Sequence, residues 1–181
     1  GRHPCARGLD PPPPSLAAGG GPTCAGRGGA NVDCWGWNAS GELGDGTTTQ
    51  RNTPTPVIGL TDVTAIATGD HHSCALISNG TAKCWGTNAD GELGDGTTTQ
   101  RLTPTAVTGL TNATAITAGT NHTCALISNG TAKCWGWNNS GRLGDGTTTK
   151  RLTPTAVTGL TNATAITAGG TPTCALPANR T

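Results

Sequence analysis

Residues 74–86 read Cys74-Ala75-Leu76-Ile77-Ser78-Asn79-Gly80-Thr81-Ala82-Lys83-Cys84-Trp85-Gly86, and residues 124–136 repeat this sequence without a substitution. The flanking sequence recurs with the same period of 50 residues. Residues 91–99 are repeated as residues 41–49 and, with Arg142 in place of Glu92, as residues 141–149. Residues 101–110 are repeated as residues 151–160. A fixed period of this length is typical of repeat architectures, in which each unit packs against its neighbours.

Each repeat carries the sequence signals of β-strands and tight turns. Residues 113–118 and 122–127 are rich in Thr, Ile and Ala in rough alternation, and Gly or Pro marks the junctions. No stretch combines helical periodicity with a capping box. The sequence therefore predicts an all-β fold.

The cysteine spacing predicts how one hairpin turns. Cys124 and Cys134 lie ten positions apart, so they can sit opposite each other on antiparallel strands only if the loop has an odd number of residues. We expect a three-residue loop, residues 128–130, with Gly130 left-handed and forming a bulge, and the same at residues 78–80. Cross-strand neighbours come close enough for a disulfide. The predicted hairpin disulfides are Cys24–Cys34, Cys74–Cys84 and Cys124–Cys134.

The composition favours a secreted protein whose core is supplemented by disulfides. Apolar residues make up 33% of the 181 residues, Phe, Tyr and Met are absent, and eight Cys are present. The net charge of +1 argues against a nucleic-acid partner, and no apolar run is long enough for a membrane span. Because no starting Met or signal peptide is present, we expect a mature or trimmed chain located outside the cell or on its surface.

The repeat also resembles a known family. His-x-Cys-Ala-Leu, then Cys-Trp-Gly-x-Asn-x-x-Gly-x-Leu-Gly-Asp-Gly, then Pro and Val-x-Gly-Leu are similar to RCC1-type (regulator of chromosome condensation) repeats of the bacterial, secreted kind with paired Cys. The resemblance covers roughly Cys24 to Leu176 and implies four-stranded antiparallel blades of a β-propeller, usually seven to a ring. This chain has about three and a half units. We divide it into an N-terminal strand and Pro-rich linker (1–23, predicted to complete a terminal blade), repeats 1 to 3 (24–73, 74–123, 124–173) and an incomplete repeat 4 (174–181).

Two cysteines remain, Cys5 and Cys174. Cys174 opens a fourth hairpin, and the sequence around Cys5 looks like a degenerate copy of the strand that would complete it. In cis, their bond would close a small four-bladed ring. In trans, Cys5 would bond Cys174 of a neighbouring subunit and link copies head to tail. The segment between Cys5 and Cys24 is about 20 residues shorter than its counterparts and contains four consecutive Pro, which favours the trans arrangement.

Two functions follow from these observations. The first is a non-enzymatic, secreted structural protein that assembles head to tail with itself into an extracellular or surface filament and is glycosylated. The alternative is a compact RCC1-like propeller that serves as a protein-binding module or inhibitor. The near-identical loops favour the first, because a specific binding face normally needs loops that differ. No nucleophile–base pair or nucleotide-binding loop is evident, so we expect no catalytic residues, and no cofactor other than covalent glycans.

The glycosylation candidates are asparagines that begin Asn-x-Ser/Thr sequons. They are Asn38, Asn79, Asn112, Asn121, Asn129, Asn138, Asn162 and Asn179.

Other side chains have a structural and a functional interpretation. Trp35, Trp85 and Trp135 each follow the second Cys of a hairpin, and we expect them to pack between blades rather than to stack on carbohydrate. His72 and His122 are expected to be structural, since Pro stands at the same repeat position elsewhere. A set of oxygen-bearing residues in the second repeat (Asn88, Asp90, Glu92 and Asp95) is reminiscent of a Ca²⁺ loop. Because Arg142 replaces the Glu in the third repeat, we interpret this set as turn-forming and predict no metal site.

Overall fold

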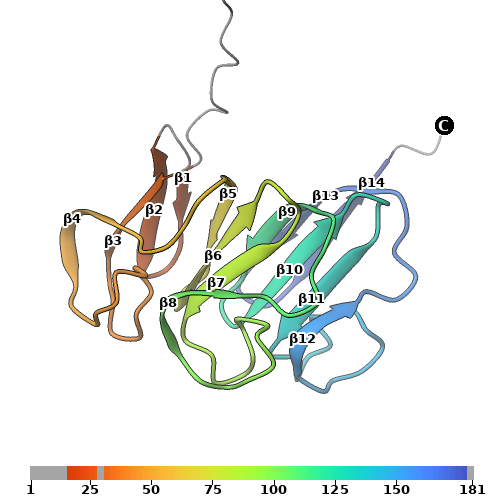
Figure 1. The fold of residues 1–181 in the computed structure, drawn as a ribbon. Coiled ribbons are helices and arrows are strands. Elements are labelled where there is room, and N and C mark those ends of the chain that lie inside the picture. The colour runs from red at the N-terminus through yellow and green to blue at the C-terminus, as the bar shows by residue number, and fades with distance from the viewer. Residues whose placement is uncertain (1–15, 28–30, 179–181) are drawn as a thin grey trace, which may run out of the picture.

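The computed structural model describes residues 16–27 and 31–178, and these form strands, turns and loops without a helix (Figure 1). The strands are β1 (Leu16–Ala18), β2 (Pro22–Arg27), β3 (Asn31–Gly36), β4 (Arg51–Pro56), β5 (Val63–Thr68), β6 (His72–Ile77), β7 (Ala82–Gly86), β8 (Arg101–Ala106), β9 (Ala113–Ala118), β10 (His122–Ile127), β11 (Ala132–Gly136), β12 (Arg151–Ala156), β13 (Ala163–Ala168) and β14 (Thr173–Pro177). The predicted all-β fold is confirmed.

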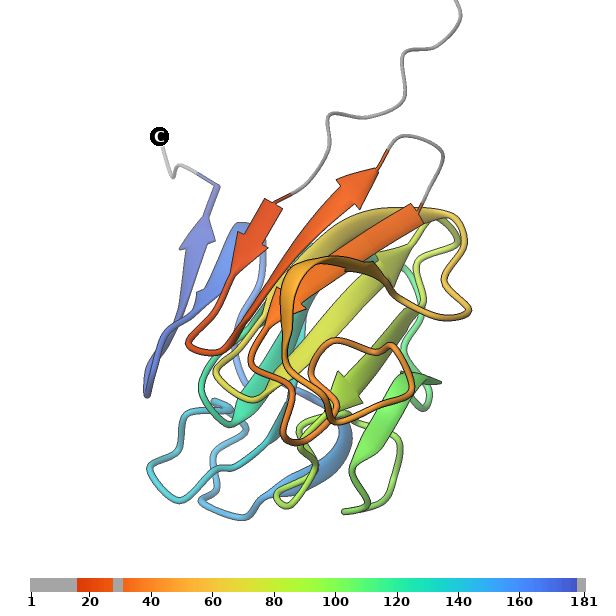
Figure 2. The same cartoon turned by 90° about the vertical axis from the view of Figure 1, so that its left-hand side faces the viewer.

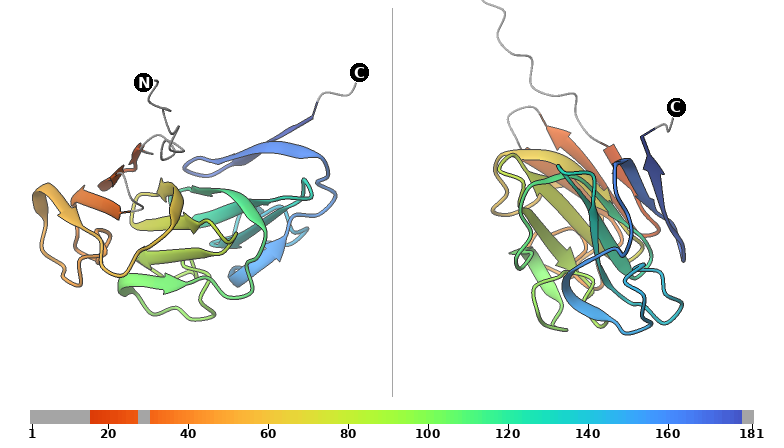
Figure 3. Two further views of the ribbon diagram at one scale, coloured as in Figure 1. Left: turned by 45° about the horizontal axis from the view of Figure 1, so that its top comes forward. Right: turned by 90° about the vertical axis from the view of Figure 1, so that its right-hand side faces the viewer.

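The strands pair in chain order into antiparallel sheets. Blades 1, 2 and 3 are the four-stranded sheets β1–β4, β5–β8 and β9–β12, and the half-blade is the two-stranded sheet β13–β14. The blades stand side by side from the orange blade 1 to the blue half-blade, with the long loops between their third and fourth strands gathered along one side of the array (Figure 1). Figure 2 views the array from blade 1, and the right panel of Figure 3 views it from the half-blade. The predicted architecture of about three and a half four-stranded blades is confirmed.

The boundaries of the blades do not coincide with those of the repeat units, which were counted from the first cysteine of each hairpin. The unit 74–123, for example, supplies most of β6 and all of β7 and β8 to blade 2, and β9 and the start of β10 to blade 3. The N-terminal unit 1–23 likewise supplies β1 and the start of β2 to blade 1, while its residues 1–15 lie outside the described residues.

The hairpin loops have the predicted length. Cys124 pairs with Cys134, and main-chain hydrogen bonds join Ile127 N–H to the Thr131 carbonyl at 2.8 Å and Gly130 N–H to the Ile127 carbonyl at 2.9 Å. Gly130 has a φ of +77°, which a side chain would disfavour. The hairpin at Gly80 has the same geometry. The three-residue turn with a left-handed glycine is therefore confirmed in both hairpins.

The outermost strand of each blade carries a proline at the same place: Pro54 in β4, Pro104 in β8 and Pro154 in β12. A proline has no N–H to donate to a ladder, so it is tolerated on an edge strand and excluded from the middle of a sheet. The Thr-Pro-Thr sequence is thus compatible with an edge strand of each blade and not with a central one.

The core lies between the blades rather than within them. We call the contacts of blades 1 and 2, of blades 2 and 3, and of blade 3 and the half-blade joints 1, 2 and 3. The joint 1 cluster is Cys24, Val32, Cys34, Leu43, Val57, Leu60, Ile66, Ala75 and Trp85. The joint 2 cluster is Cys74, Leu76, Ala82, Cys84, Leu93, Val107, Leu110, Ala113, Ala125, Ile127 and Trp135. Joint 3 has a smaller buried cluster of Cys124, Cys134 and Leu143, against which Val157 and Ile166 pack.

The three hairpin disulfides are part of these clusters. Cys24–Cys34, Cys74–Cys84 and Cys124–Cys134 are bonded, and all six residues are fully buried. In a chain without Phe, Tyr or Met they supply part of the apolar contact that larger side chains would give.

Candidate binding site at the end of the blade array

Each complete joint is built around one tryptophan. The indole N–H of Trp85 donates to the carbonyl of Glu42 at 2.8 Å, and that of Trp135 donates to the carbonyl of Glu92 at 2.9 Å. Both tryptophans are fully buried. The later blade thus supplies the indole, and the loop of the earlier blade supplies the acceptor.

A hydroxyl and a histidine complete the polar part of joint 2. The Thr123 hydroxyl donates to the same Glu92 carbonyl at 2.8 Å and lies 2.8 Å from Nε2 of His72, which comes from the neighbouring blade. Because the hydroxyl proton is directed at Glu92, Nε2 of His72 must carry the proton in that contact, which leaves Nδ1 bare. Nδ1 of His72 is buried and has no partner. The histidine is therefore a neutral, structural group, as the sequence led us to expect.

Burial lowers the pKa of His72 from 6.5 to about 3. The folded protein then takes up a proton on His72 less readily than the unfolded chain does, so this contribution to stability is complete above pH 6.5 and is lost as the pH falls towards 3. When the pH is lowered from 7 to 5, protonation of His72 in the unfolded chain is expected to lower the free energy of unfolding by about 2 kcal/mol. Urea unfolding at both pH values, compared between the unmodified chain and His72→Gln, measures the difference.

The matched control for this prediction is His71→Gln, because His71 is exposed. It should keep the pH dependence of the unmodified chain. Burial raises the pKa of Glu92 and so acts in the opposite direction, which is why the comparison is made between variants. An unchanged pH dependence in His72→Gln would show that His72 is not the group responsible.

Trp35 lies differently from the two later tryptophans. It is only half-buried, because no blade precedes blade 1 in the described part of the chain. Among the described residues Trp35 therefore does not pack between two blades, contrary to our expectation. Trp85 and Trp135 do pack between blades, as expected.

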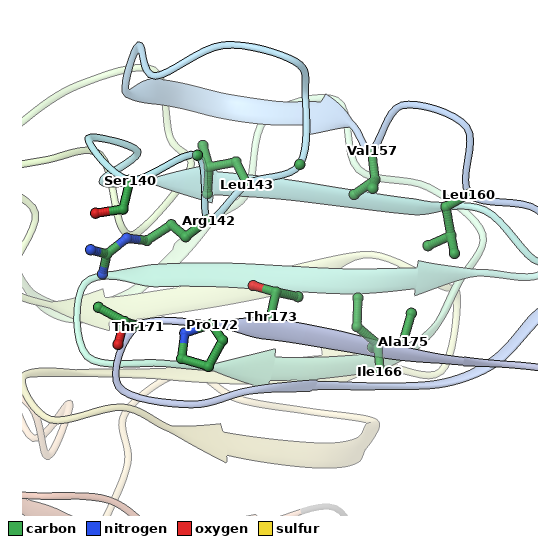
Figure 4. Close-up of a pocket in the computed structure, with 12 residues that line it drawn as sticks. Ser140, Arg142, Leu143, Val157, Leu160, Ile166, Thr171, Pro172, Thr173 and Ala175 are labelled. Carbon is green, nitrogen blue, oxygen red and sulfur yellow. The ribbon is translucent and has the colours of Figure 1, made fainter.

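Joint 3 contains a pocket of about 560 Å³, which we call the end pocket (Figure 4). It is lined by Ser140, Gly141, Arg142, Leu143, Gly144, Val157, Leu160, Ile166, Thr171, Pro172, Thr173 and Ala175. The apolar members Leu143, Val157, Leu160, Ile166 and Ala175 occupy the repeat positions of Leu93, Val107, Leu110, Ile116 and Ala125, which surround Trp135 in joint 2. The end pocket is therefore the third copy of a tryptophan-binding environment.

Arg142 lines one end of this pocket beside Ser140 and Thr171, at the position where the other repeats have a glutamate (Figure 4). Its guanidinium lies 4.2 Å from the centre of the Trp137 ring and donates to the Gly170 carbonyl at 3.4 Å. The main-chain carbonyl of Arg142 occupies the repeat position of the two glutamate carbonyls that accept from Trp85 and Trp135.

The strand beside the end pocket, β14, has a free edge. Among the described residues β14 pairs only with β13, whereas β2, β6 and β10 each pair on both sides. Leu176 on β14 is 63% exposed, while its repeat equivalents Leu76 and Leu126 are 3% and 6% exposed. An unpaired edge of this kind is a template for a further strand.

Cys174 is also on this strand. It is exposed and has no disulfide partner among the described residues. Its repeat equivalents Cys24, Cys74 and Cys124 are all bonded to a cysteine on the neighbouring third strand. Cys5, the predicted partner, lies outside the described residues, so the pairing of Cys5 with Cys174 stays a prediction.

The long loops between the third and fourth strands are locked by buried asparagines. The Asn88 amide nitrogen donates to the Asp95 carboxylate at 3.1 Å and to the carbonyls of Thr97 and Thr99 at 3.1 Å, and Asp95 also forms an ion pair with Arg101 at 2.8 Å. The Asp95 carboxylate and the two loop carbonyls are thus engaged by N–H donors. The described residues contain no group of three or more His, Cys, Asp or Glu placed to hold a metal ion.

The same network sorts the glycosylation candidates by access. Asn38 and Asn138 are buried and use their amide nitrogens as Asn88 does, so a glycan on either would remove these hydrogen bonds. The exposed candidates are Asn79, Asn112, Asn129 and Asn162; Asn121 is partly buried and Asn179 lies outside the described residues.

Sequence reasoning did not find the end pocket or the glutamate carbonyls, and it named Asn38, Asn88 and Asn138 without their role in locking the loops. The pocket could have been found from the repeat register, since residues 143–175 repeat the residues that surround Trp135 in joint 2. No sequence signal indicated that Glu42 is an acceptor, because the accepting group is its main-chain carbonyl, which every residue type has.

Comparison with known proteins supports the interpretation of the repeat. The model of the regulator of chromosome condensation (RCC1) repeat matches residues 32–76, 79–126 and 129–176, and a second RCC1 repeat model matches residues 63–92 and 113–142. A comparison with curated proteins gave no match. No helix of the described residues is long and apolar enough to cross a bilayer.

Several solved structures share the fold. Prp20p from Saccharomyces cerevisiae, described with its binding properties to Gsp1p and histones, is 22% identical with a TM-score of 0.79 over 88% of this chain and 42% of its own. Human WBSCR16 is 24% identical with a TM-score of 0.81 over 91% of this chain and 44% of its own. The ectodomain of the Physcomitrella patens receptor kinase CR4 is 29% identical with a TM-score of 0.59 over 90% of this chain and 37% of its own. The chain thus spans less than half of each of these proteins.

Three matched repeats that together cover most of the sequence, on blades of the same architecture, lead to one conclusion: the chain belongs to the family of RCC1 repeat proteins.

Proposed function

We propose that this chain is a non-enzymatic protein-binding module that binds its partner by adding a strand of the partner to the free edge of β14. The observation that carries the proposal is that edge itself, which lies beside the end pocket. Relatives of the same fold are described as binding proteins: Prp20p is described with Gsp1p and histones, and yeast RCC1 with Kap60.

The register of the repeat indicates which groups of β14 would bind. In blade 3 the Cα atoms of Cys124 and Cys134 are 4.1 Å apart, the spacing of a pair without hydrogen bonds, so the residues on either side of each cysteine make the cross-strand bonds. The equivalent residues of β14 are Thr173 and Ala175. Their N–H and C=O groups therefore face the free edge, where main-chain bonds supply affinity and the neighbouring pocket supplies specificity.

A synthetic peptide tests strand addition. Thr-Ala-Lys-Ser-Trp-Gly-Trp copies residues 131–137 with serine for cysteine, which prevents disulfide exchange. We expect it to bind the full chain and to slow amide hydrogen exchange at Thr173 and Ala175. Ala175→Pro removes one outward N–H at an edge position that tolerates proline, and should abolish binding. If the peptide protects neither amide, β14 is not a strand-addition site.

A second candidate function is head-to-tail self-assembly, in which the added strand is the leading segment of another copy. Exposed Cys174 favours it, because Cys5 is the other cysteine outside the three disulfides. In the matching register Ala6 stands where the repeats have tryptophan, so this segment would leave the end pocket without an indole. Disulfides persist in oxidising compartments, so both functions are proposed for an extracellular or cell-surface protein.

Electrophoresis of the full chain with and without reductant tests self-assembly. A ladder of covalent oligomers that collapses to one band on reduction is expected, and Cys5→Ser and Cys174→Ser should each remove it. A single monomer band from the unmodified chain under both conditions would contradict the trans pairing, and a Cys5–Cys174 bond found within that monomer by peptide mapping would establish the cis pairing.

A further inference from the structure

We propose that the end pocket binds the indole of a tryptophan on the added strand, and that the partner's strand carries a cysteine immediately before that tryptophan. The inference rests on strand addition at β14 and names the chemistry of the partner. Two features of joint 3 carry it, the apolar pocket and the exposed Cys174. One would bind a ring and the other a thiol, and in the repeat register they would meet neighbouring residues of one added strand.

The pocket fits an indole because the same residues hold one twice elsewhere in the chain. In joint 2 the ring of Trp135 packs in the cluster of Leu93, Val107 and Leu110. A Cβ placed on Gly94 would come 2.7 Å from Nε1 of Trp135, and one on Gly44 would come 2.8 Å from Nε1 of Trp85. Glycine at this position therefore makes room for the ring. At the third copy, Gly144, the nearest atom to such a Cβ is Cγ1 of Val157 at 3.0 Å, and no ring is in contact.

The polar groups of a complete joint have counterparts in joint 3. The carbonyl of Arg142 stands at the position of the Glu42 and Glu92 carbonyls, which accept from the two buried indoles at 2.8 and 2.9 Å. Thr173 stands at the position of Thr123, and its hydroxyl already lies 2.8 Å from Nε2 of His122. A strand added to β14 would thus find the apolar walls, the acceptor and the hydroxyl of joints 1 and 2.

The cysteine follows from the register. In every blade the residue opposite the first hairpin cysteine is a cysteine, and the next residue is the tryptophan. A strand that places its tryptophan in the end pocket therefore places the preceding residue opposite Cys174. With oxidised glutathione as the disulfide oxidant, the two thiols form one S–S bond and give up two protons and two electrons, and glutathione disulfide becomes two glutathione thiols.

Peptide binding tests the indole site. Relative to Thr-Ala-Lys-Ser-Trp-Gly-Trp, the peptide with alanine for the first tryptophan should bind the full chain at least about tenfold more weakly. Equal affinity of the two peptides, with protection of the Ala175 amide by both, would overturn the indole site and leave strand addition intact. No protection by either would remove the proposed function and this inference together.

A matched pair of glycine variants tests the pocket from the protein side. Gly144→Ala narrows the space for the ring, whereas Gly146→Ala meets nothing closer than the Thr158 hydroxyl at 4.0 Å. Both residues have positive φ, +66° and +79°, so both variants carry the strain of a left-handed alanine. Peptide affinity should fall at least about tenfold in Gly144→Ala and stay unchanged in Gly146→Ala. Equal losses in the two variants would overturn the inference.

Covalent capture tests the register and the source of the strand. The peptide Thr-Ala-Lys-Cys-Trp-Gly-Trp with oxidised glutathione should label Cys174 of the unmodified chain and fail to label Cys174→Ser. A peptide that copies residues 1–8 is the competitor. If that peptide labels Cys174 faster than the tryptophan peptide, the occupant is the leading segment of another copy and the proposed partner chemistry is wrong.

Discussion

Replacing Trp135 by alanine is expected to lower the free energy of unfolding by about 3–5 kcal/mol, one of the two largest losses we expect in this chain. The ring is fully buried between blades 2 and 3, where a chain without Phe, Tyr or Met has few other large side chains. Truncation would leave a cavity among Leu93, Val107 and Leu110, which lie in the two loops that flank β8 and can close it only in part. Urea unfolding followed by circular dichroism measures the loss.

Two variants separate packing from hydrogen bonding. Trp135→Phe keeps most of the ring volume and removes the donor to the Glu92 carbonyl, which still accepts from Thr123, so we expect a loss of about 1–2 kcal/mol. Trp37→Ala is the surface control, because Trp37 is 51% exposed, and it should cost less than about 1 kcal/mol. A loss in Trp135→Ala no larger than in Trp37→Ala would show that the joints do not hold the blades together.

Removing hairpin disulfides is the second change with a large expected effect. The double substitution Cys124→Ala and Cys134→Ala opens a bond with a sequence separation of 10, for which the chain-entropy model predicts a loss of about 2–3 kcal/mol. Cys74–Cys84 has the same separation and should give a similar loss. Because domains of this size have net stabilities of about 5–15 kcal/mol, we expect loss of all three bonds to unfold the array.

Thermal unfolding of the single-bond variants and of the fully reduced, alkylated chain provides the measurement. Thr108→Ala is the control, since Thr108 is exposed, and its unfolding temperature should not change. Native circular dichroism of the fully alkylated chain would contradict the view that disulfides stabilise this thin core.

Local features of the fold were accessible to sequence reasoning because they depend on neighbours in the chain. The separation of ten positions between Cys124 and Cys134 requires a hairpin loop with an odd number of residues, and Gly130 lies where a three-residue loop needs a positive φ. The count of blades followed from the period. The family resemblance added the four-stranded blade, which alternation of Thr, Ile and Ala alone would not have specified.

The candidate site was not accessible in the same way, because its contacts join residues about 30–50 positions apart. Glu42 accepts from Ser73 and Trp85 through its main-chain carbonyl, which any residue type could provide. Asn38 matches a glycosylation sequon, yet its amide is committed to the loop network, and only the fold shows that it is buried. The sequence identified the repeated tryptophans, but only the assembled blades show which residues surround each ring.

The division of roles within a joint also gives the array a direction. In joints 1 and 2 the acceptor carbonyl comes from the earlier blade and the indole from the later one, so the two faces of a blade are not interchangeable. Any association that reproduces this contact must join unlike faces, and a twofold-symmetric pairing of like faces cannot satisfy it. A partner that docks on the half-blade through this contact must therefore present the face that carries the indole.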